Sequence, residues 1–380
     1  MNVIDLFSGC GGLSLGFKQA GYDVTRAVEL DPGIAATYRE NHPETDMIVD
    51  DIRNIDNTGV FREGDADVII GGPPCQGFSM AGARIRGGFI DDPRNYLFRH
   101  YFNVVRTVRP AVFVMENVKG ITTMQGGRIF EEILGTFSDP ELLGGRPYHV
   151  YPRLVRAIQF GVPQKRERMV LIGTLREVGD MDALWKETRE DICREYPHYF
   201  DPVTVRDAIG NLGATSADGK IANPVARTEY QRYLACDRES VTNHTQTRHS
   251  PVATDRMRRV ASGENYTVLE ETIRSVHSGS YGRLSWEEQA PTVTTRFDTP
   301  AGGRFIHPEE DRTLSPREAA RIQSFPDDFV FCGTKTSICK QIGNAVPPKI
   351  AYFLARLAQK IIDNVHGEAK DESGITEKMG

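Results

Sequence analysis

The stretch NVIDLFSGCGGLSLGF, residues 2–17, decides the fold of the first part of this chain. An apolar run of strand length leads into three glycines, Gly9, Gly11 and Gly12, and then into a helix-length segment. Glycines at such a turn let the backbone approach a ligand closely. Their spacing does not match GxGxxG, which argues against a dinucleotide cofactor. The stretch is typical of the first strand, turn and helix of an α/β sheet that binds a different ligand.

Six further apolar runs follow in the first 175 residues. They are rich in Val and Ile and mostly do not alternate with polar residues, as expected where both faces of a strand are buried. Helix-length segments lie between them, so residues 1–175 predict an α/β domain with a parallel sheet covered by helices. The six runs are residues 23–30, 46–51, 66–72, 110–118, 151–158 and 168–174.

The texture of the sequence changes after residue 175. Residues 176–310 have shorter apolar runs and turn-rich segments, which predict a second, smaller and less regular domain. Residues 315–324 then form a capped helix, and residues 347–365 form an amphipathic helix that begins at prolines. Residues 367–380 contain few apolar side chains, and we expect them to be disordered.

The composition excludes several classes of protein. Hydrophobic residues make up 39% and charged residues 26% of the 380 positions, which is typical of a soluble globular protein. No run approaches the ~20 apolar residues of a membrane span, and the first residues lack a signal peptide, so we expect a cytoplasmic protein. The six cysteines form no CxxC pair, so we expect neither a metal site nor a disulfide framework.

The net charge of −6 is unusual for a nucleic-acid-binding protein, but a total charge does not describe its distribution. Arginine is concentrated in three runs, residues 84–109, 153–168 and 248–259. Taken alone, each run is more typical of a solvated face than of a binding site.

A single cysteine, Cys75, stands at the end of the fourth predicted strand in the sequence GGPPCQGFS, residues 71–79. Pro73 and Pro74 stiffen the turn by fixing their φ angles. An isolated cysteine is most often a small buried hydrophobe. Here it lies at the sheet edge where ligands of α/β proteins bind, and a thiolate there is suited to attack an electrophilic carbon.

Two other motifs favour the reactive interpretation. Glu116 ends the fifth strand after the run AVFVM, where partial desolvation would raise the pKa of a carboxyl group and suit it to proton donation. The sequence QKRER, residues 164–168, places Gln164, Arg166 and Arg168 at alternate positions before the seventh strand. Alternation puts the two guanidinium groups on one face.

The ends of the first three strands predict a site for a cofactor that contains adenosine. The glycine turn follows the first strand, Glu29 can accept hydrogen bonds from ribose hydroxyls, and Asp51 can read an adenine amino group. Ordinary turns and caps explain each feature alone, but explain all three together poorly. Beside such a site, thiolate addition to C6 of a protonated pyrimidine would make C5 nucleophilic toward a sulfonium methyl group.

Together, these motifs resemble those of the DNA (cytosine-5) methyltransferases of bacterial restriction-modification systems. The motifs that carry the resemblance are DLFSGCGGLSLGF, GGPPCQGFS, ENV, QKRER, SPREAARIQSFPDDF and QIGNAVPP, in the family's order. The resemblance implies a Rossmann-like mixed sheet of the S-adenosylmethionine-dependent methyltransferase fold, with a target-recognition domain over residues 176–310. It also implies that residues 311–366 return to the catalytic domain.

The resemblance further implies roles for single residues. Cys75 would be the nucleophile, Glu116 the proton donor to N3 of cytosine and Arg168 a contact to O2, with Arg166 and Gln164 beside them. The family usually has Gly-Asp-Ile where this chain has Asp50-Asp51-Ile52, so the adenine contact is open between Asp50 and Asp51. The implied cofactor-binding residues are Phe7, Gly9, Gly11, Gly12, Glu29, Asp51, Ile52, Pro74 and Asn344.

The DNA contacts are predicted from arginine, threonine and glycine content. Residues 80–98 are interpreted as a loop that closes over a flipped base, residues 254–260 as phosphate contacts and residues 292–305 as groove contacts. The candidate residues are Gln76, Ser79, Arg84, Arg86, Arg94, Arg296 and Arg304.

Double-stranded DNA is the expected partner, together with a restriction endonuclease that shares the target site. We expect a monomer, because one catalytic chain suffices for one flipped base. We expect it to be associated with the nucleoid. Three alternatives remain open. A tRNA cytosine-5 methyltransferase would share the motifs. A catalytically silent DNA-binding relative would not need Cys75, Glu116 and Arg168. A Rossmann dehydrogenase is weakened by the missing GxGxxG and explains neither Cys75 nor QKRER.

Overall fold

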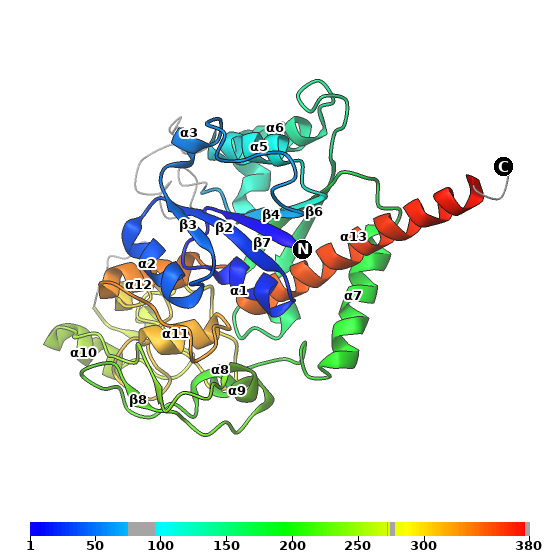
Figure 1. The fold of residues 1–380 in the computed structure, drawn as a ribbon. Coiled ribbons are helices and arrows are strands. Elements are labelled where there is room, and N and C mark those ends of the chain that lie inside the picture. The colour runs from blue at the N-terminus through cyan, green and yellow to red at the C-terminus, as the bar shows by residue number, and fades with distance from the viewer. Residues whose placement is uncertain (75–95, 272, 274–277, 377–380) are drawn as a thin grey trace.

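The computed structural model of the chain describes residues 1–74, 96–271, 273 and 278–376, and the side chains of these residues up to position 364 (Figure 1). The upper part of Figure 1 is a twisted sheet covered by helices, and the lower part is a lobe of short helices and loops. A long C-terminal helix crosses the first part and extends beyond it.

The sheet has seven strands in the order β3-β2-β1-β4-β5-β7-β6. All seven predicted runs form strands, which confirms the α/β fold class. The bounds are β1 Asn2–Leu6, β2 Asp23–Glu29, β3 Asp46–Val49, β4 Val68–Gly71, β5 Val112–Val118, β6 His149–Arg156 and β7 Glu167–Thr174.

The sheet is mixed and not purely parallel. Strands β1 to β5 are parallel to one another, whereas β7 is antiparallel to both β5 and β6. The connection between β6 and β7 explains the difference. Residues 157–166 contain only a short helix, η4 Ala157–Phe160, and a parallel connection needs a crossover of about a dozen residues or more.

Side chains from the central strands contribute to two separate cores. In β5, Val112 and Val114 face one core, and Phe113 and Met115 face the other. Helices α1 Gly12–Gln19 and α13 Pro348–Thr376 cover the first face, and α5 Leu97–Val108 and α6 Arg128–Ser138 cover the second. Burial on both faces is the physical reason that these strands read as continuous apolar runs.

The remaining elements of this part follow strands β2, β3 and β5, and the first of them packs against β2 and β3. They are α2 Pro32–Asn41, α3 Ile52–Ile55 and the 3-10 helix η3 Lys119–Gly127, which follows β5 directly.

Helix α13 attaches the C-terminal part of the chain to the sheet. A Cβ atom added to Gly16 of α1 would lie 2.4 Å from the Cβ atom of Ala351, so the two helices pack in close contact. Helix α7 Met181–Glu195 packs along α13 and belongs to the same core. The segment after α7 contributes Tyr199 and Phe200 to this core. This core therefore extends past the boundary at residue 175 that the sequence predicts.

The lower lobe has a second core, which contains side chains from Val203 to Ile342 together with Cys10 of the glycine turn. Helices α11 Pro316–Ile322 and α12 Lys335–Asn344 belong to this core. The segment between them also contacts the sheet part, because Asn41 and Thr37 of α2 hydrogen-bond to the backbone of Val330 and Cys332. Other elements of the lobe are α8 Val205–Ile209, β8 Ile221–Ala222, α9 Glu229–Leu234, β9 Ser240–Val241, α10 Pro251–Arg258, η5 Tyr266–Val268 and η6 Pro300–Gly302.

Two predictions about helix ends have clear outcomes. Ser315 and Glu318 form the expected capping box at the start of α11, with Pro316 at its first position. Helix α13 continues to Thr376, so the structure describes helix over most of the tail for which the sequence predicts disorder. Within the described residues, no helix is both long and apolar enough to cross a bilayer.

Candidate active site

The ends of β4 and β5 are joined by the side chain of Asn117. Its amide nitrogen donates a 3.0 Å hydrogen bond to the carbonyl oxygen of Pro73, and its amide oxygen accepts from the backbone of Val118. The backbone at Gly72 also passes close to Glu116, since an added Cβ atom would lie 3.2 Å from Oε2. The segment that leads to position 75 is therefore fastened beside Glu116.

Six predicted site residues lie outside the residues that the structure describes. They are Cys75, Gln76, Ser79, Arg84, Arg86 and Arg94.

Glu116 and Arg168 meet across the β5–β7 pair. Arg168 Nε lies 2.8 Å from Glu116 Oε1, and the two side chains are only 18% and 11% exposed. The angle of this contact is not that of a hydrogen bond, so the buried Oε1 has no hydrogen-bond donor among the described residues. A buried carboxyl oxygen normally has such a partner, and its lack here leaves this atom able to bind a substrate group.

Gln164 and Arg166 are buried and connect the start of β7 to the lower lobe. The Gln164 amide donates to the side chain of Gln323 at 2.5 Å and accepts from the backbone of Val293. Arg166 donates to the carbonyl oxygens of Gly343 and Asn344 at 3.0 and 3.4 Å.

These contacts separate the two arginines that the sequence places on one face. Burial, with the nearby charge of Arg168, holds the pKa of Arg166 well below its usual value. The hydrogen bonds of Arg166 go to the backbone of the lower lobe, whereas Arg168 pairs with Glu116. Arg168 is thus the guanidinium placed at the carboxyl group, and Arg166 holds the segment around Asn344.

The glycine turn after β1 has the backbone conformations that its sequence predicts. Phe7, Gly9 and Gly11 have φ angles of 58°, 56° and 95°, in the left-handed region. A Cβ atom at Gly11 would lie 2.5 Å from the ring of His42, so only glycine fits there. A Cβ atom at Gly9 would meet no atom within 4 Å, which leaves open space above the turn.

Glu29 closes this turn from the end of β2. Its two carboxylate oxygens accept hydrogen bonds from the backbone nitrogens of Gly9 and Asp31 at 3.0 and 2.9 Å. Burial raises the pKa of Glu29, and these two hydrogen bonds act in the opposite direction. Each oxygen keeps further acceptor capacity, which suits the diol of a ribose.

Asp51 is engaged by its own neighbours. Its side chain caps α3 through the backbone of Arg53 at 3.0 Å and also binds the Arg53 guanidinium, which lowers the pKa of the carboxyl group. Asp50 accepts hydrogen bonds from the backbone of Asp51 and the side chain of Asn54. Ile52 is buried beside them.

Asn344 comes from the far end of the chain, yet its segment touches the glycine turn. A Cβ atom added to Gly12 would lie 2.4 Å from the carbonyl oxygen of Val346. The turn after β1 and the segment after α12 are therefore in direct contact. Pro74 is the last residue described before position 75 and is half-buried.

Sequence reasoning missed three residues at this site. Leu30 is 63% exposed directly after Glu29, so it presents an apolar surface beside this carboxylate. Asn117 fastens the Pro73 segment, and His42 supports the glycine turn with its Nε2 atom 3.3 Å from the carbonyl oxygen of Gly11. The apolar residue after a strand-end carboxylate was the available signal for Leu30. His42 had no signal, because its contact depends on the tertiary fold.

The arginines expected to contact DNA are mostly paired within the lower lobe. Arg304 donates to the backbone carbonyls of Glu264 and Arg283 at 3.0 and 3.3 Å, so its guanidinium stabilises loops. Arg296 is 65% exposed and lies 3.8 Å from Asp298. The arginines of residues 254–260 are also paired. Arg256 pairs with Glu271 and Arg258 with Asp311. Arg259 pairs with both Asp255 and Glu271.

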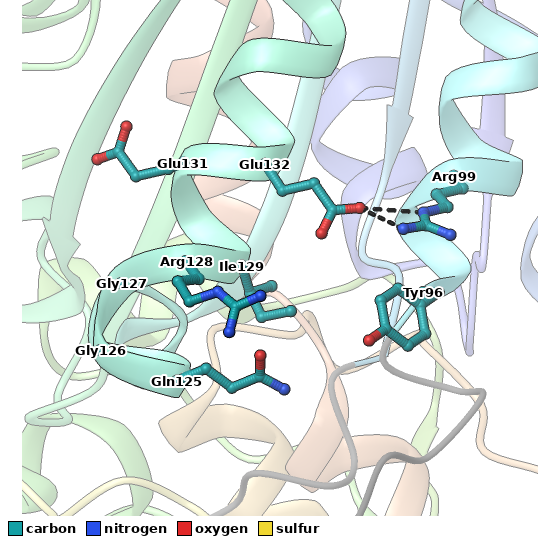
Figure 2. A pocket seen from close by; sticks show the side chains of 9 residues that line it. All are labelled: Tyr96, Arg99, Gln125, Gly126, Gly127, Arg128, Ile129, Glu131 and Glu132. Atoms are coloured by element: carbon teal, nitrogen blue, oxygen red, sulfur yellow. Dashed lines mark hydrogen bonds and ion pairs between the residues drawn. The ribbon is translucent and has the colours of Figure 1, made fainter.

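A cavity of about 700 Å³ lies between the start of α5, the end of η3 and the start of α6 (Figure 2). Figure 2 shows Arg99 paired with Glu132 on one side and Arg128 below the α6 helix. The cavity contains none of the predicted site residues. Its lining is Tyr96, Arg99, Gln125, Gly126, Gly127, Arg128, Ile129, Glu131 and Glu132.

The residues around the glycine turn fit an adenosine-type cofactor on three observations. The turn has open space at Gly9, Glu29 has unused acceptor capacity beside it, and Leu30 offers an exposed apolar surface. No group of three or more His, Cys, Asp or Glu residues in the described part of the chain is arranged to hold a metal ion.

Comparison with known proteins identifies the family. The family model of C-5 cytosine-specific DNA methylases matches residues 1–360. The chain is 35% identical to the type II methyltransferase M1.HphI of Haemophilus parahaemolyticus, over 96% of this chain and 88% of that protein. It is 34% identical to M.DdeI of Desulfomicrobium norvegicum, over 96% of this chain and 90% of that protein.

Solved structures agree with this result. A prophage-encoded protein of E. coli, proposed to be a DNA modification methyltransferase, superposes with a TM-score of 0.73 and 29% identity over 96% of this chain and 99% of that one. The Dnmt2 methyltransferase of S. pombe shares the fold, with a TM-score of 0.55 and 14% identity over 96% and 99% of the two chains. The chain therefore belongs to the family of C-5 cytosine-specific DNA methylases.

Proposed function

We propose that this enzyme transfers a methyl group from S-adenosylmethionine to C5 of a flipped-out cytosine within a specific double-stranded DNA sequence. Cys75 attacks C6 and forms a covalent adduct, Glu116 donates a proton to N3, and Arg168 binds O2. The observation that supports this proposal best is the buried pair of Glu116 and Arg168 beside the segment that leads to position 75.

The chemistry explains why these groups belong together. Addition of a thiolate to C6 places negative charge on the N3–O2 side of the ring, where a carboxylic acid and a guanidinium can neutralise it. The adduct makes C5 nucleophilic. Flipping is required because C5 and C6 lie inside the base stack.

The cofactor would lie over the glycine turn after β1. S-adenosylmethionine supplies an electrophilic methyl group when bound, and leaves as S-adenosylhomocysteine. Glu29 would hold the ribose hydroxyls, Leu30 would contact the adenine ring, and the backbone at Gly9 and Gly11 would approach the amino-acid part. For the adenine amino group, Asp51 remains the candidate even though Arg53 already binds its carboxylate.

Double-stranded DNA is the proposed substrate, and the type II names of the relatives support a restriction endonuclease with the same target site as a partner. We propose that the enzyme acts as a monomer at the nucleoid. Two alternatives are retained as outcomes of the test: tRNA as the substrate and a DNA-binding protein without activity.

The test is incubation of the protein with unmethylated genomic DNA and S-adenosylmethionine, followed by bisulfite sequencing. Protected cytosines within one short motif are the expected result and identify product, substrate and target together. Protected cytosines in tRNA but not in DNA would assign tRNA as the substrate in place of DNA. No protection of either, with retained DNA binding, would contradict the proposed activity.

A further inference from the structure

A second cavity, of about 450 Å³, lies where the start of α13 meets α9 and the segment after α7. Its volume is within the range of small-molecule sites. Lys349, in the first turn of α13, contributes to its lining and is 3% exposed. The exposed rim includes Tyr196, His198 and Arg232. We call this space the Lys349 cavity.

Three tyrosine rings surround the Lys349 amine. The Nζ atom lies 4.2 Å from the ring centre of Tyr199, 4.9 Å from that of Tyr233 and 5.6 Å from that of Tyr230. The same amine donates a 2.6 Å hydrogen bond to the carbonyl oxygen of Tyr199. The amine is therefore held at a fixed place in an aromatic cavity.

The amine lacks the partner that buried lysines usually have. Within the described residues, no carboxylate oxygen is paired with Nζ within 4.0 Å, and the Tyr199 carbonyl is its one hydrogen-bond acceptor. An ammonium group has three donors, so burial with a single acceptor disfavours the charged form. The methyl-transfer mechanism uses none of these groups.

We propose that Lys349 is a covalent modification site, at which a small aromatic aldehyde enters the Lys349 cavity and condenses with the side-chain amine. The amine nitrogen forms a bond to the carbonyl carbon, the carbonyl oxygen leaves as water with two protons, and an imine remains. This condensation changes no oxidation state overall, so it needs no oxidant or reductant. The tyrosine faces would stack on the aromatic ring of the aldehyde.

The electrostatics of the cavity support a nucleophilic amine. Burial lowers the pKa of Lys349 to about 7, and the charge of Asp201 acts in the opposite direction. The tyrosine faces also favour the cation, but by only ~0.5–2 kcal/mol. Of the other ionisable groups of the lining, Glu195, His198, Glu229 and Arg232 are ion-paired, and Asp207 accepts from the backbone of Thr204. The hydroxyls of Tyr199 and Tyr230 donate to backbone carbonyls and Tyr196 is exposed, whereas the buried Tyr233 hydroxyl has no hydrogen-bond partner among the described residues.

The experiment treats the folded protein with benzaldehyde and sodium cyanoborohydride at pH 7.5 and measures adducts at each lysine by peptide mapping. The exposed Lys165, Lys220 and Lys340 serve as internal references. An ordinary lysine has a pKa near 10.4 and is about 0.1% neutral at this pH, so we expect Lys349 to react about tenfold faster or more. A rate at Lys349 equal to or below the references would overturn the proposal.

Two controls test the cavity itself. In urea that unfolds the protein, the preference for Lys349 should disappear, and its persistence would show that the cavity is not the cause. Lys349→Arg keeps a cation and a donor to the Tyr199 carbonyl but cannot form an imine, so its fast-reacting adduct should be absent. Formaldehyde in place of benzaldehyde should show a weaker preference, because it cannot stack on the tyrosine rings.

Discussion

Arg168 Nε lies 2.8 Å from Glu116 Oε1 across an antiparallel strand pair. The register pairs Val118 with Arg168, so the two side chains are two residues apart on the same face of the sheet. The pair exists because β7 runs antiparallel to β5. A parallel β7 would bring Thr174, and not Arg168, to the carboxyl end of β5.

Glu116→Gln should reduce kcat by about 10²-fold or more, because an amide cannot donate the acidic proton to N3. Binding of S-adenosylmethionine should change little, since Glu116 is not among the residues around the glycine turn. Single-turnover methylation and isothermal titration measure the two effects. Glu132→Gln, which removes the exposed partner of Arg99, is the matched control. Equal rates for wild type and Glu116→Gln would assign proton donation elsewhere.

Cys75→Ser should abolish methyl transfer and retain cofactor binding, because a hydroxyl is a far weaker nucleophile than a thiolate at neutral pH. Trapping on DNA that contains 5-fluorocytosine, read as a shifted band on a denaturing gel, should occur with wild type alone. Normal turnover by the serine variant would rule out the covalent mechanism.

Asn117→Ala should lower kcat by about tenfold or more with little change in the KM for S-adenosylmethionine. The side chain positions the Pro73 carbonyl beside Glu116, and small misplacements of reacting groups are costly. Steady-state kinetics separate the two parameters. Asn103→Ala on α5, which removes a comparable hydrogen bond to Asp56 at the end of α3, is the control and should leave both parameters near wild type. A raised KM with unchanged kcat would contradict a positioning role.

Asp5 should make the stability of the protein depend on pH. It is fully buried beneath the glycine turn, where Ser14 donates to it at 2.6 Å, and burial raises its pKa to about 7. The folded state therefore holds a proton that the unfolded state releases near pH 4. The contribution of Asp5 to the free energy of unfolding is therefore complete below about pH 4. It falls by about 1.4 kcal/mol per pH unit as the pH rises toward 7.

Asp5→Asn removes this titration, so the difference in unfolding free energy between wild type and variant should fall from pH 4 to pH 7. Urea denaturation at several pH values measures it. The variant must be compared with wild type at each pH because His42 also titrates in this range. Burial lowers the pKa of His42 to about 4, so His42 makes the free energy of unfolding rise with pH where Asp5 makes it fall. A pH-independent difference would contradict the prediction.

Glu271→Gln should strengthen binding to nonspecific DNA and make it more dependent on salt. Glu271 pairs with Arg256 and Arg259, and these partners lower its pKa to about 2. Its removal would free two guanidinium groups for phosphates, and each new contact adds about 0.9 to the slope of log K against log salt. Glu229→Gln, which frees Arg232, is the control. An unchanged slope would place residues 254–260 away from DNA.

The strands and the glycine turn were predictable because local sequence determines them. Continuous Val and Ile runs reflect burial on both faces of the sheet, and positive φ angles at Gly9 and Gly11 require glycine. The same locality explains why the capping box of Ser315 and Glu318 was readable from four residues. The family followed from motifs of this local kind.

Tertiary structure alone decided which partners these residues have. The alternate spacing of Arg166 and Arg168 predicts one shared face. In the structure, Arg166 donates to the backbone of residues 343–344, whereas Arg168 is ion-paired with Glu116 of β5, and both partners are far away in the chain. Arg304 looked like a free cation and is occupied by loop carbonyls. Long-range contacts leave no periodicity in the sequence. Local chemistry therefore determined the sheet and the motifs, and packing between distant segments determined the site.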